Sequence, residues 1–172
     1  MPTFRFANGT EEEAATLADL VQRAYRGDVG WTTETALLAG KRVDAESVLQ
    51  RTQDLEARVL VAEKDDTIIG CCEIVLRKTG QAAYFGMLAV EPGLQTAGLG
   101  RAILAEAEKR AKEVWGVASI EMTVLAQRET LVQWYERRGY EKTGTTQIFP
   151  VDVDLGTPLR DDLHFVVLRK KI

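Results

Sequence analysis

The centre of the chain carries an apolar segment, a glycine-containing turn and an amphipathic segment in direct succession. Residues 83–90 are apolar and compatible with a strand, the turn 95–100 follows, and apolar residues then recur at helical spacing. In such a strand-to-helix turn the free N–H groups and the dipole of the helix favour an anion such as phosphate. Gly98 and Gly100 lack a Cβ, which would hold a phosphate away from the backbone. The sequence therefore predicts a site for a phosphorylated ligand.

The remaining segments alternate between strand-like and helix-like patterns. Apolar alternation and short apolar runs predict strands at residues 3–7, 58–63, 67–76, 82–90, 117–125, from 140 onward, and at 163–169. Helical spacing and caps predict helices from Asn8 or Thr10 to about Arg26, from Thr32 or Thr33 through Leu38, from Asp44 to Leu55, over 98–114 and over 129–138. We therefore expect an α/β fold of the α+β type, with one domain over residues 1–172. Its central sheet is expected to be twisted, mixed and mostly antiparallel, begun by a hairpin over residues 58–76 and flanked by helices.

Composition narrows the class of protein. At 172 residues, with 45% hydrophobic and 28% charged residues, the chain is long enough for one domain with a substantial core and is typical of a soluble protein. No segment approaches the ~20 consecutive apolar residues of a membrane helix, so we expect no membrane association. The N-terminus lacks the pattern of a secretory signal, which favours a cytoplasmic location. The net charge of −4 disfavours general nucleic-acid binding.

The cysteines and the single histidine restrict the chemistry further. Cys71 and Cys72 are adjacent, so on a strand their side chains point to opposite faces and a disulfide between them is not expected. His164 lies in a strand-like run and is interpreted as a structural residue. A metal cluster built from histidines, and a Ser-His or Cys-His nucleophile, would have to use this one residue. We therefore expect no metal site.

The glycine turn by itself is also compatible with a dinucleotide-binding fold. That fold places an acidic residue about 20 positions after the turn, and Glu121 stands near this spacing. However, Ile103 occupies the position of the third glycine. The unit also follows a predicted hairpin, whereas the fingerprint usually opens its domain. These two features disfavour the dinucleotide-binding fold.

A second motif, Tyr135-Glu136-Arg137-Arg138-Gly139-Tyr140, stands at the end of the next predicted helix. Together with the strand end Leu88-Ala89-Val90-Glu91-Pro92 and the turn Gln95-x-x-Gly98-x-Gly100, it resembles the GNAT superfamily of acetyl-CoA-dependent N-acetyltransferases. The resemblance implies that acetyl-CoA is the co-substrate and that a primary amine of a small molecule or peptide attacks it directly in a ternary complex. It also implies a monomer or a homodimer. The alternative is a non-catalytic acyl-CoA-binding or sensing module.

The resemblance implies roles for individual residues. The implied cofactor-binding residues are Leu88, Ala89 and Val90 beside the pantetheine arm, and Gln95, Thr96, Ala97, Gly98, Leu99, Gly100 and Arg101 around the pyrophosphate. Gln95 stands where many members carry arginine. Tyr135 matches the tyrosine that members often place near the thioester sulfur. A phenol, with a pKa near 10 against about 8.5 for a thiol, can protonate the leaving thiolate, so Tyr135 is the expected general acid.

Four positions near this tyrosine need a separate interpretation. Arg128 and Leu131 stand where many members have an asparagine and a small residue. Arg128 is expected to reach CoA, although the usual asparagine contact to the pantetheine cannot be carried over. We interpret Trp134 as a packing residue and Arg138 as a solvated one, with contact to a phosphate of CoA as the alternative for Arg138.

The acceptor side is less strongly indicated. Glu73, Tyr84 and Glu121 are candidates on the central strands for the base that deprotonates the amine, with an ordered water as the alternative. The family draws its substrate specificity largely from two segments. In this chain these contain Trp31 and Glu34, and also Asp152 and Asp154. An aromatic wall with carboxylates suits a small cationic amine.

Overall fold

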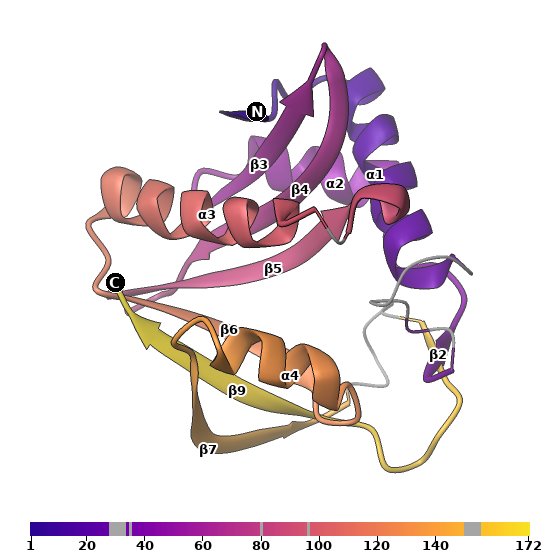
Figure 1. The fold of residues 1–172 in the computed structure, drawn as a ribbon, viewed down its shortest axis with the longest axis vertical. Coiled ribbons are helices and arrows are strands. Elements are labelled where there is room, and N and C mark those ends of the chain that lie inside the picture. Colours follow the sequence, from indigo (N-terminus) through magenta and orange to yellow (C-terminus); the bar gives the residue numbers. More distant parts are fainter. Residues whose placement is uncertain (28–33, 35, 80, 96, 150–155) are drawn as a thin grey trace.

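The computed structural model contains one seven-stranded sheet and four α-helices over the residues it describes, which are 1–172 except 28–33, 35, 80, 96 and 150–155 (Figure 1). In spatial order the strands are β1 (Thr3–Phe6), β3 (Ala57–Lys64), β4 (Thr67–Leu76), β5 (Ala82–Val90), β6 (Ser119–Leu125), β9 (His164–Lys171) and β7 (Glu141–Ile148). Only β5 and β6 pair in parallel, so the sheet is mixed and mostly antiparallel, as predicted. A two-stranded ribbon joins β2 (Leu38–Ala39) to β8 (Thr157–Pro158). The helices are α1 (Glu11–Arg26), α2 (Ala45–Gln53), α3 (Leu99–Trp115) and α4 (Glu129–Glu136), and a short 3₁₀ turn, η1 (Pro92–Leu94), precedes α3.

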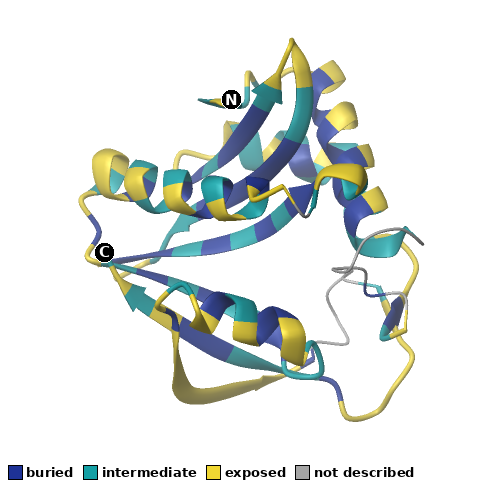
Figure 2. Ribbon diagram, viewed as in Figure 1, coloured by how far each residue is buried: buried dark blue, intermediate teal, exposed yellow. Residues whose placement is uncertain are grey.

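The helices divide between the two faces of the sheet, and each face has its own buried cluster (Figure 2). α1 and α2 cover one face, where Leu17 of α1 shares a cluster with Val61 of β3. α3 and α4 cover the other face, where Ile103 of α3 belongs to a second cluster. Successive strand residues point to opposite faces, so Cys71 and Cys72 fall into different clusters as free, buried thiols. The prediction that they form no mutual disulfide is confirmed.

The middle of the sheet opens between its two parallel strands. β5 and β6 pair only from Ala82–Tyr84 to Ser119–Glu121, and no further register joins them beyond that point. The other edge of β5 has a bulge, where pairing shifts between Cys71 and Glu73 of β4 and the φ of Met87 is +53°. The bulge bends β5 away from β6. Its carboxyl end therefore keeps backbone groups that no neighbouring strand of the described chain satisfies.

Two local predictions meet different outcomes. The hairpin forms as expected, because Asp65 and Asp66 take φ values of +50° and +60°, which is the two-residue turn compatible with strand twist. The predicted short helix through Leu38 is wrong at its end, since Leu38 pairs with Pro158 in β2·β8. Its beginning lies outside the described residues. Leu38 is buried with Phe149 and Leu163, so distant contacts override the local helical pattern.

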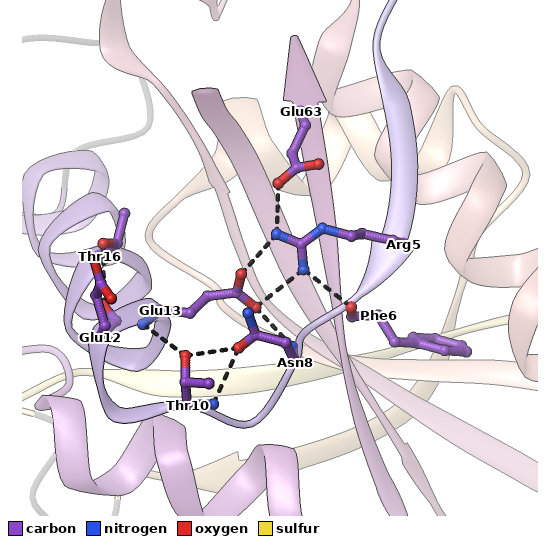
Figure 3. A network of polar contacts seen from close by, with 8 residues as sticks. All are labelled: Arg5, Phe6, Asn8, Thr10, Glu12, Glu13, Thr16 and Glu63. Atoms are coloured by element: carbon purple, nitrogen blue, oxygen red, sulfur yellow. Dashed lines mark hydrogen bonds and ion pairs between the residues drawn. The ribbon is translucent and has the colours of Figure 1, made fainter. Parts of the chain in front are cut away.

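A polar network fixes the start of α1 against the sheet (Figure 3). Thr10 caps the helix by accepting a hydrogen bond from the N–H of Glu13 at 3.2 Å. The Glu13 carboxylate accepts from Arg5 at 2.6 Å and from the N–H of Asn8 at 2.8 Å, and Arg5 also bonds to Glu63. Burial acts to raise the pKa of Glu13, but the bonds from Arg5 and Asn8 outweigh it and hold the pKa below its usual value.

This lowered pKa predicts a specific acid sensitivity. Glu13 stabilises the fold above its unfolded pKa of about 4.3, and the contribution is lost as the pH falls through the lower folded pKa. We expect Glu13→Gln to be less stable than wild type at neutral pH in urea unfolding, with a difference that shrinks in acid. The exposed neighbour Glu12 provides the control variant, Glu12→Gln. An undiminished difference in acid would assign the effect to packing.

None of the helices in the described residues is long and apolar enough to span a bilayer.

Candidate active site

A cavity of about 430 Å³ lies on the side of the sheet that carries α3 and α4. Its walls come from the end of β5, the start of α3 and one side of α4. The lining residues are Tyr25, Leu88, Val90, Gln95, Gly98, Gly100, Arg101, Arg128, Leu131, Trp134, Tyr135 and Arg138. The predicted strand, the glycine turn and the tyrosine motif thus meet at one cavity.

The start of α3 is built to receive an anion. Gly98 has a left-handed φ of +79° and supplies no side-chain cap, so the N–H groups of residues 99–101 find no acceptor among the described residues. A Cβ at Gly100 would lie 3.6 Å from the Trp134 ring and would narrow the cavity. Gln95 points back along the turn, and its amide donates to the carbonyl of Val90 at 3.5 Å.

Arginines extend this positive end toward α4. Arg138 lies over the Trp134 ring at 3.7 Å and donates from Nη1 to the Trp134 carbonyl at 2.7 Å. Its Nε is buried without a partner in the described chain. Burial, and then repulsion from Arg137 and Arg101, lower the pKa of Arg138. This group of cations with an unused buried donor suits a polyphosphate.

A second cavity of about 130 Å³ lies where β5 and β6 separate, and residues of both core clusters line it. Tyr84, Gly86 and Met87 of β5 and Thr123 of β6 contribute to its walls. It shares five residues with the first cavity, namely Tyr25, Leu88, Arg128, Leu131 and Tyr135. The two cavities therefore approach one another through the opening between β5 and β6.

Tyr135 stands at this junction. Its side chain is 5% exposed, and its ring makes edge contacts with Trp134 at 5.0 Å and with Tyr140 at 5.9 Å between centroids. The hydroxyl has no hydrogen-bond partner among the described residues. Burial is the main cause that raises the pKa of Tyr135 well above its usual value, so the phenol stays protonated at neutral pH. A residue with a neutral phenol thus lines both cavities.

A buried ion cluster forms one wall of the second cavity. The Glu34 carboxylate pairs with Arg26 and accepts a bond from Arg128 at 3.0 Å, and the three side chains are 4% to 10% exposed. Arg42 lies over the Tyr25 ring at 4.9 Å, and Arg128 is 5.7 Å from the same ring. Burial raises the pKa of Tyr25 to about 12, against the opposing influence of the two arginines. Tyr25 therefore provides a neutral aromatic surface between cations.

Some of the predicted cofactor residues line the first cavity and others do not. The cavity is lined by Leu88, Val90, Gln95, Gly98, Gly100, Arg101 and Arg128, and by the expected acid Tyr135. Ala89 is buried beneath α1, Leu99 is buried in the other core cluster, and Ala97 is exposed in the turn. None of these three lines either cavity, and Thr96 lies outside the described residues. The alternation of side chains along β5 explains why Leu88 and Val90 face the cavity and Ala89 does not.

Of the predicted acceptor residues, some line the second cavity and others pair with arginines elsewhere. Glu34 and Tyr84 line the second cavity, and the Tyr84 hydroxyl lies 3.0 Å from Thr123 Oγ1. Glu73 instead pairs with Arg51 at 3.1 Å, and Glu121 accepts from Arg169 at 2.9 Å. Neither of these carboxylates lines the two cavities. Trp31, Asp152 and Asp154 lie outside the described residues.

Several lining residues were not indicated by the sequence. Trp134 and Arg138, interpreted above as packing and solvated residues, both line the first cavity. Their spacing of four residues near the end of α4 places them on one side, a signal that was present locally. Tyr25 and Arg42 come from segments distant in sequence from the motifs, and no local pattern marks them. No group of three metal-binding side chains occurs in the part of the chain that the structure describes.

Comparison with known proteins agrees with this geometry. The family model described as an acetyltransferase (GNAT) domain matches residues 20–150, which is most of the chain. The chain belongs to the GNAT acetyltransferase family. No curated protein sequence matches it significantly.

Solved structures share the GNAT fold over nearly the whole chain at low sequence identity. The Escherichia coli ribosomal-protein-S18-alanine N-acetyltransferase is 18% identical, with a TM-score of 0.71 over 100% of this chain and 94% of its own. A proposed acetyltransferase from Salmonella typhimurium with its cofactor acetyl-CoA is 20% identical, with a TM-score of 0.68 over 99% and 94%. A chimera of spermidine N-acetyltransferase from Vibrio cholerae and hSSAT is 15% identical, with a TM-score of 0.70 over 99% and 95%. At these identities the likeness concerns the fold.

Proposed function

We propose that this GNAT domain transfers an acetyl group from acetyl-CoA to a primary amine by direct attack in a ternary complex. One observation carries the proposal. A cavity with the start of a helix suited to an anion and a second, adjoining cavity share the residue Tyr135. Two substrates, one in each cavity, would meet beside a buried phenol. A module that only binds acyl-CoA has no need for the second cavity.

The first cavity fits the parts of acetyl-CoA. The end of β5 pairs with β4 but not with β6, and on its β6 side Leu88 and Val90 offer backbone groups to the amides of a pantetheine arm. The uncapped start of α3 offers N–H groups to the pyrophosphate. Arg101 and Arg138 add positive charge, and the buried Nε of Arg138 is a donor that a phosphate oxygen would satisfy. Such a placement directs the thioester toward Tyr135.

The chemistry follows from this arrangement. The amine nitrogen attacks the thioester carbonyl carbon, and the C–S bond of the resulting tetrahedral adduct then breaks. Tyr135 donates its proton to the departing sulfur, so that CoA leaves as a neutral thiol. The proton released by the amine leaves through the second cavity, which would hold the acceptor and is called the acceptor cavity below. Of the base candidates Glu73, Tyr84 and Glu121, Tyr84 is the one that lines its wall. Water in that cavity completes the transfer, and a proton from solvent restores the phenol.

A thiol-release assay over a panel of amines tests the function. The expected result is release of CoA that depends on both acetyl-CoA and an amine, with formation of the N-acetylated amine by mass spectrometry. Calorimetric titration with acetyl-CoA accompanies the assay. Tight binding of acetyl-CoA without thiol release on any amine would contradict an enzyme and favour a non-catalytic acyl-CoA-binding module.

The glycine turn provides a test of the cofactor site. The left-handed φ of Gly98 is unfavourable for alanine, so Gly98→Ala shifts the turn and misplaces the N–H groups of α3. We expect acetyl-CoA affinity to fall by about tenfold, which corresponds to the ~1–2 kcal/mol cost of that backbone conformation. Gly144→Ala is a matched control, because Gly144 has a φ of +84° with open space around it, in β7. Equal losses of affinity in the two variants would contradict a specific role for the turn.

A further inference from the structure

The described wall of the acceptor cavity carries more positive than negative charge. Arg42 and Arg128 line it, and Glu34 is the one carboxylate among its described lining residues. Glu34 already pairs with Arg26 and, at 3.0 Å, with Arg128. Its charge is therefore compensated within the protein. The expectation that Glu34 attracts a cationic amine does not agree with this arrangement.

Arg42 is the cationic side chain of this wall that does not pair with Glu34. It is half-buried, it lies over the neutral Tyr25 ring at 4.9 Å, and it forms no ion pair with any described residue. An aromatic face attracts a cation but leaves its formal charge intact. Arg42 therefore brings to this wall a positive charge that no carboxylate of the described chain pairs with. Such a guanidinium opposes a second cation and attracts an anion.

We propose that the acceptor is a small amine that carries a carboxylate near its nitrogen, as an α-amino acid does. This inference rests on the proposed function and deepens it. The carboxylate would lie against Arg42, because a guanidinium fork matches the two oxygens of a carboxylate. The amine would then extend toward Tyr135 and the thioester. The cavity of about 130 Å³ is smaller than the ~300–1,000 Å³ of typical drug-sized sites, which favours a short acceptor.

Amino acids and their carboxamides provide matched acceptors for the test. Each pair has the same side chain and the same amine, and the two members differ by one negative charge. We expect kcat/KM in the thiol-release assay to be about 10- to 100-fold higher for the acid, which is the usual effect of one charge-assisted pair. Polyamines should be poor acceptors. A carboxamide or a polyamine that reacts as well as the acid would overturn the proposal.

Amine basicity works against the expected result, which makes the comparison more stringent. The α-amine of a carboxamide, like that of a chain N-terminus, has a pKa near 8, whereas an adjacent carboxylate raises the pKa of an amine. At about pH 7.5 the carboxamide therefore offers more of the free amine that can attack. Without recognition of charge, the carboxamide would be the better acceptor.

A pair of lysine and arginine variants locates the recognition. Arg42→Gln should raise KM for the amino acid by about tenfold or more and bring the acid and the carboxamide close to parity, with KM for acetyl-CoA unchanged. Lys41→Gln removes the same charge one residue away, from an exposed side chain that does not line the cavity. It should leave unchanged the KM for the amino acid, the preference for the acid over the carboxamide, and the KM for acetyl-CoA. Equal effects of the two variants would contradict the assignment of Arg42.

A binding measurement separates this inference from the proposed function. Calorimetric titration of the CoA-saturated protein with the amino acid that gives the strongest response in the panel requires no turnover. Binding of the acid, weaker binding of its carboxamide, and loss of the difference in Arg42→Gln would support the acceptor class even if no thiol were released. Thiol release with neutral amines alone, together with no binding of any amino acid, would retain the enzyme and reject the acceptor class.

Discussion

Replacement of Tyr135 by phenylalanine should lower kcat by about 10²- to 10³-fold and leave KM for acetyl-CoA nearly unchanged. The reason is that Tyr135 lines both cavities and that its hydroxyl, in the proposed reaction, protonates the departing sulfur. The ring remains in place, so its contacts with Trp134 and Tyr140 are kept. Steady-state kinetics with a saturating amine measures the effect.

Tyr140→Phe is the matched control for this prediction. The Tyr140 ring packs directly on Tyr135, but its hydroxyl donates to Glu108 at 2.9 Å and lines neither cavity. Its loss should cost stability and leave kcat largely intact. Retention of most of the activity in Tyr135→Phe, or an equal loss in both variants, would remove Tyr135 from the mechanism.

The pH dependence offers a further check on the same residue. Burial raises the pKa of Tyr135, so the phenol keeps the proton that it must donate throughout the neutral and moderately alkaline range. No fall in kcat from ionisation of this group is therefore expected below about pH 10. A fall in kcat below that pH that is absent from Tyr135→Phe would show that the phenol ionises in the working range.

Replacement of Glu34 by glutamine should lower the free energy of unfolding by about 3 kcal/mol, which is more than a hundredfold in the folding equilibrium. Glu34 pairs with Arg26 and Arg128, and the side chains of all three are at least nine-tenths buried. Removal of the carboxylate takes from two buried guanidinium groups a negative charge that pairs with both of them. Urea unfolding followed by circular dichroism measures the change.

Glu113→Gln is the control for an exposed ion pair. Glu113 faces Lys109 at 4.0 Å, and both side chains are more than half exposed, so we expect a change below ~0.5 kcal/mol. Similar changes in Glu34→Gln and Glu113→Gln would mean that water already screens the buried cluster. Glu34→Gln should also weaken the acceptor kinetics, because Arg128 loses the partner that holds it beside the cavity.

Features that depend on neighbouring residues in sequence were predictable. Thr10 and Asp44 cap their helices as expected, since a cap requires only a short side chain and the next helical turn. The turn at Gly98 was predictable for the same reason. The two motifs around Gly98 and Tyr135 were sufficient to indicate the GNAT family, because each motif is a short pattern of neighbouring residues.

Features that depend on distant residues were not predictable. A glutamate on a strand or loop looks the same in sequence whether it faces a substrate or an arginine. Glu121 accepts from Arg169, and Glu34 pairs with Arg128, 94 positions further along the chain. The short helix expected through Leu38 failed in the same way, because its partner Pro158 comes from the far end of the chain.

The sequence by itself determined the alternating pattern of strands and helices, the glycine turn and the tyrosine motif, and with them the family. Those features follow from local periodicity and backbone conformation. Only the tertiary structure decided that the turn, Tyr135 and the opening between β5 and β6 meet at one junction, and that Arg42 in the second cavity pairs with no carboxylate of the described chain. The sign of a cavity's charge depends on which side chains neutralise one another, and that depends on contacts between distant segments.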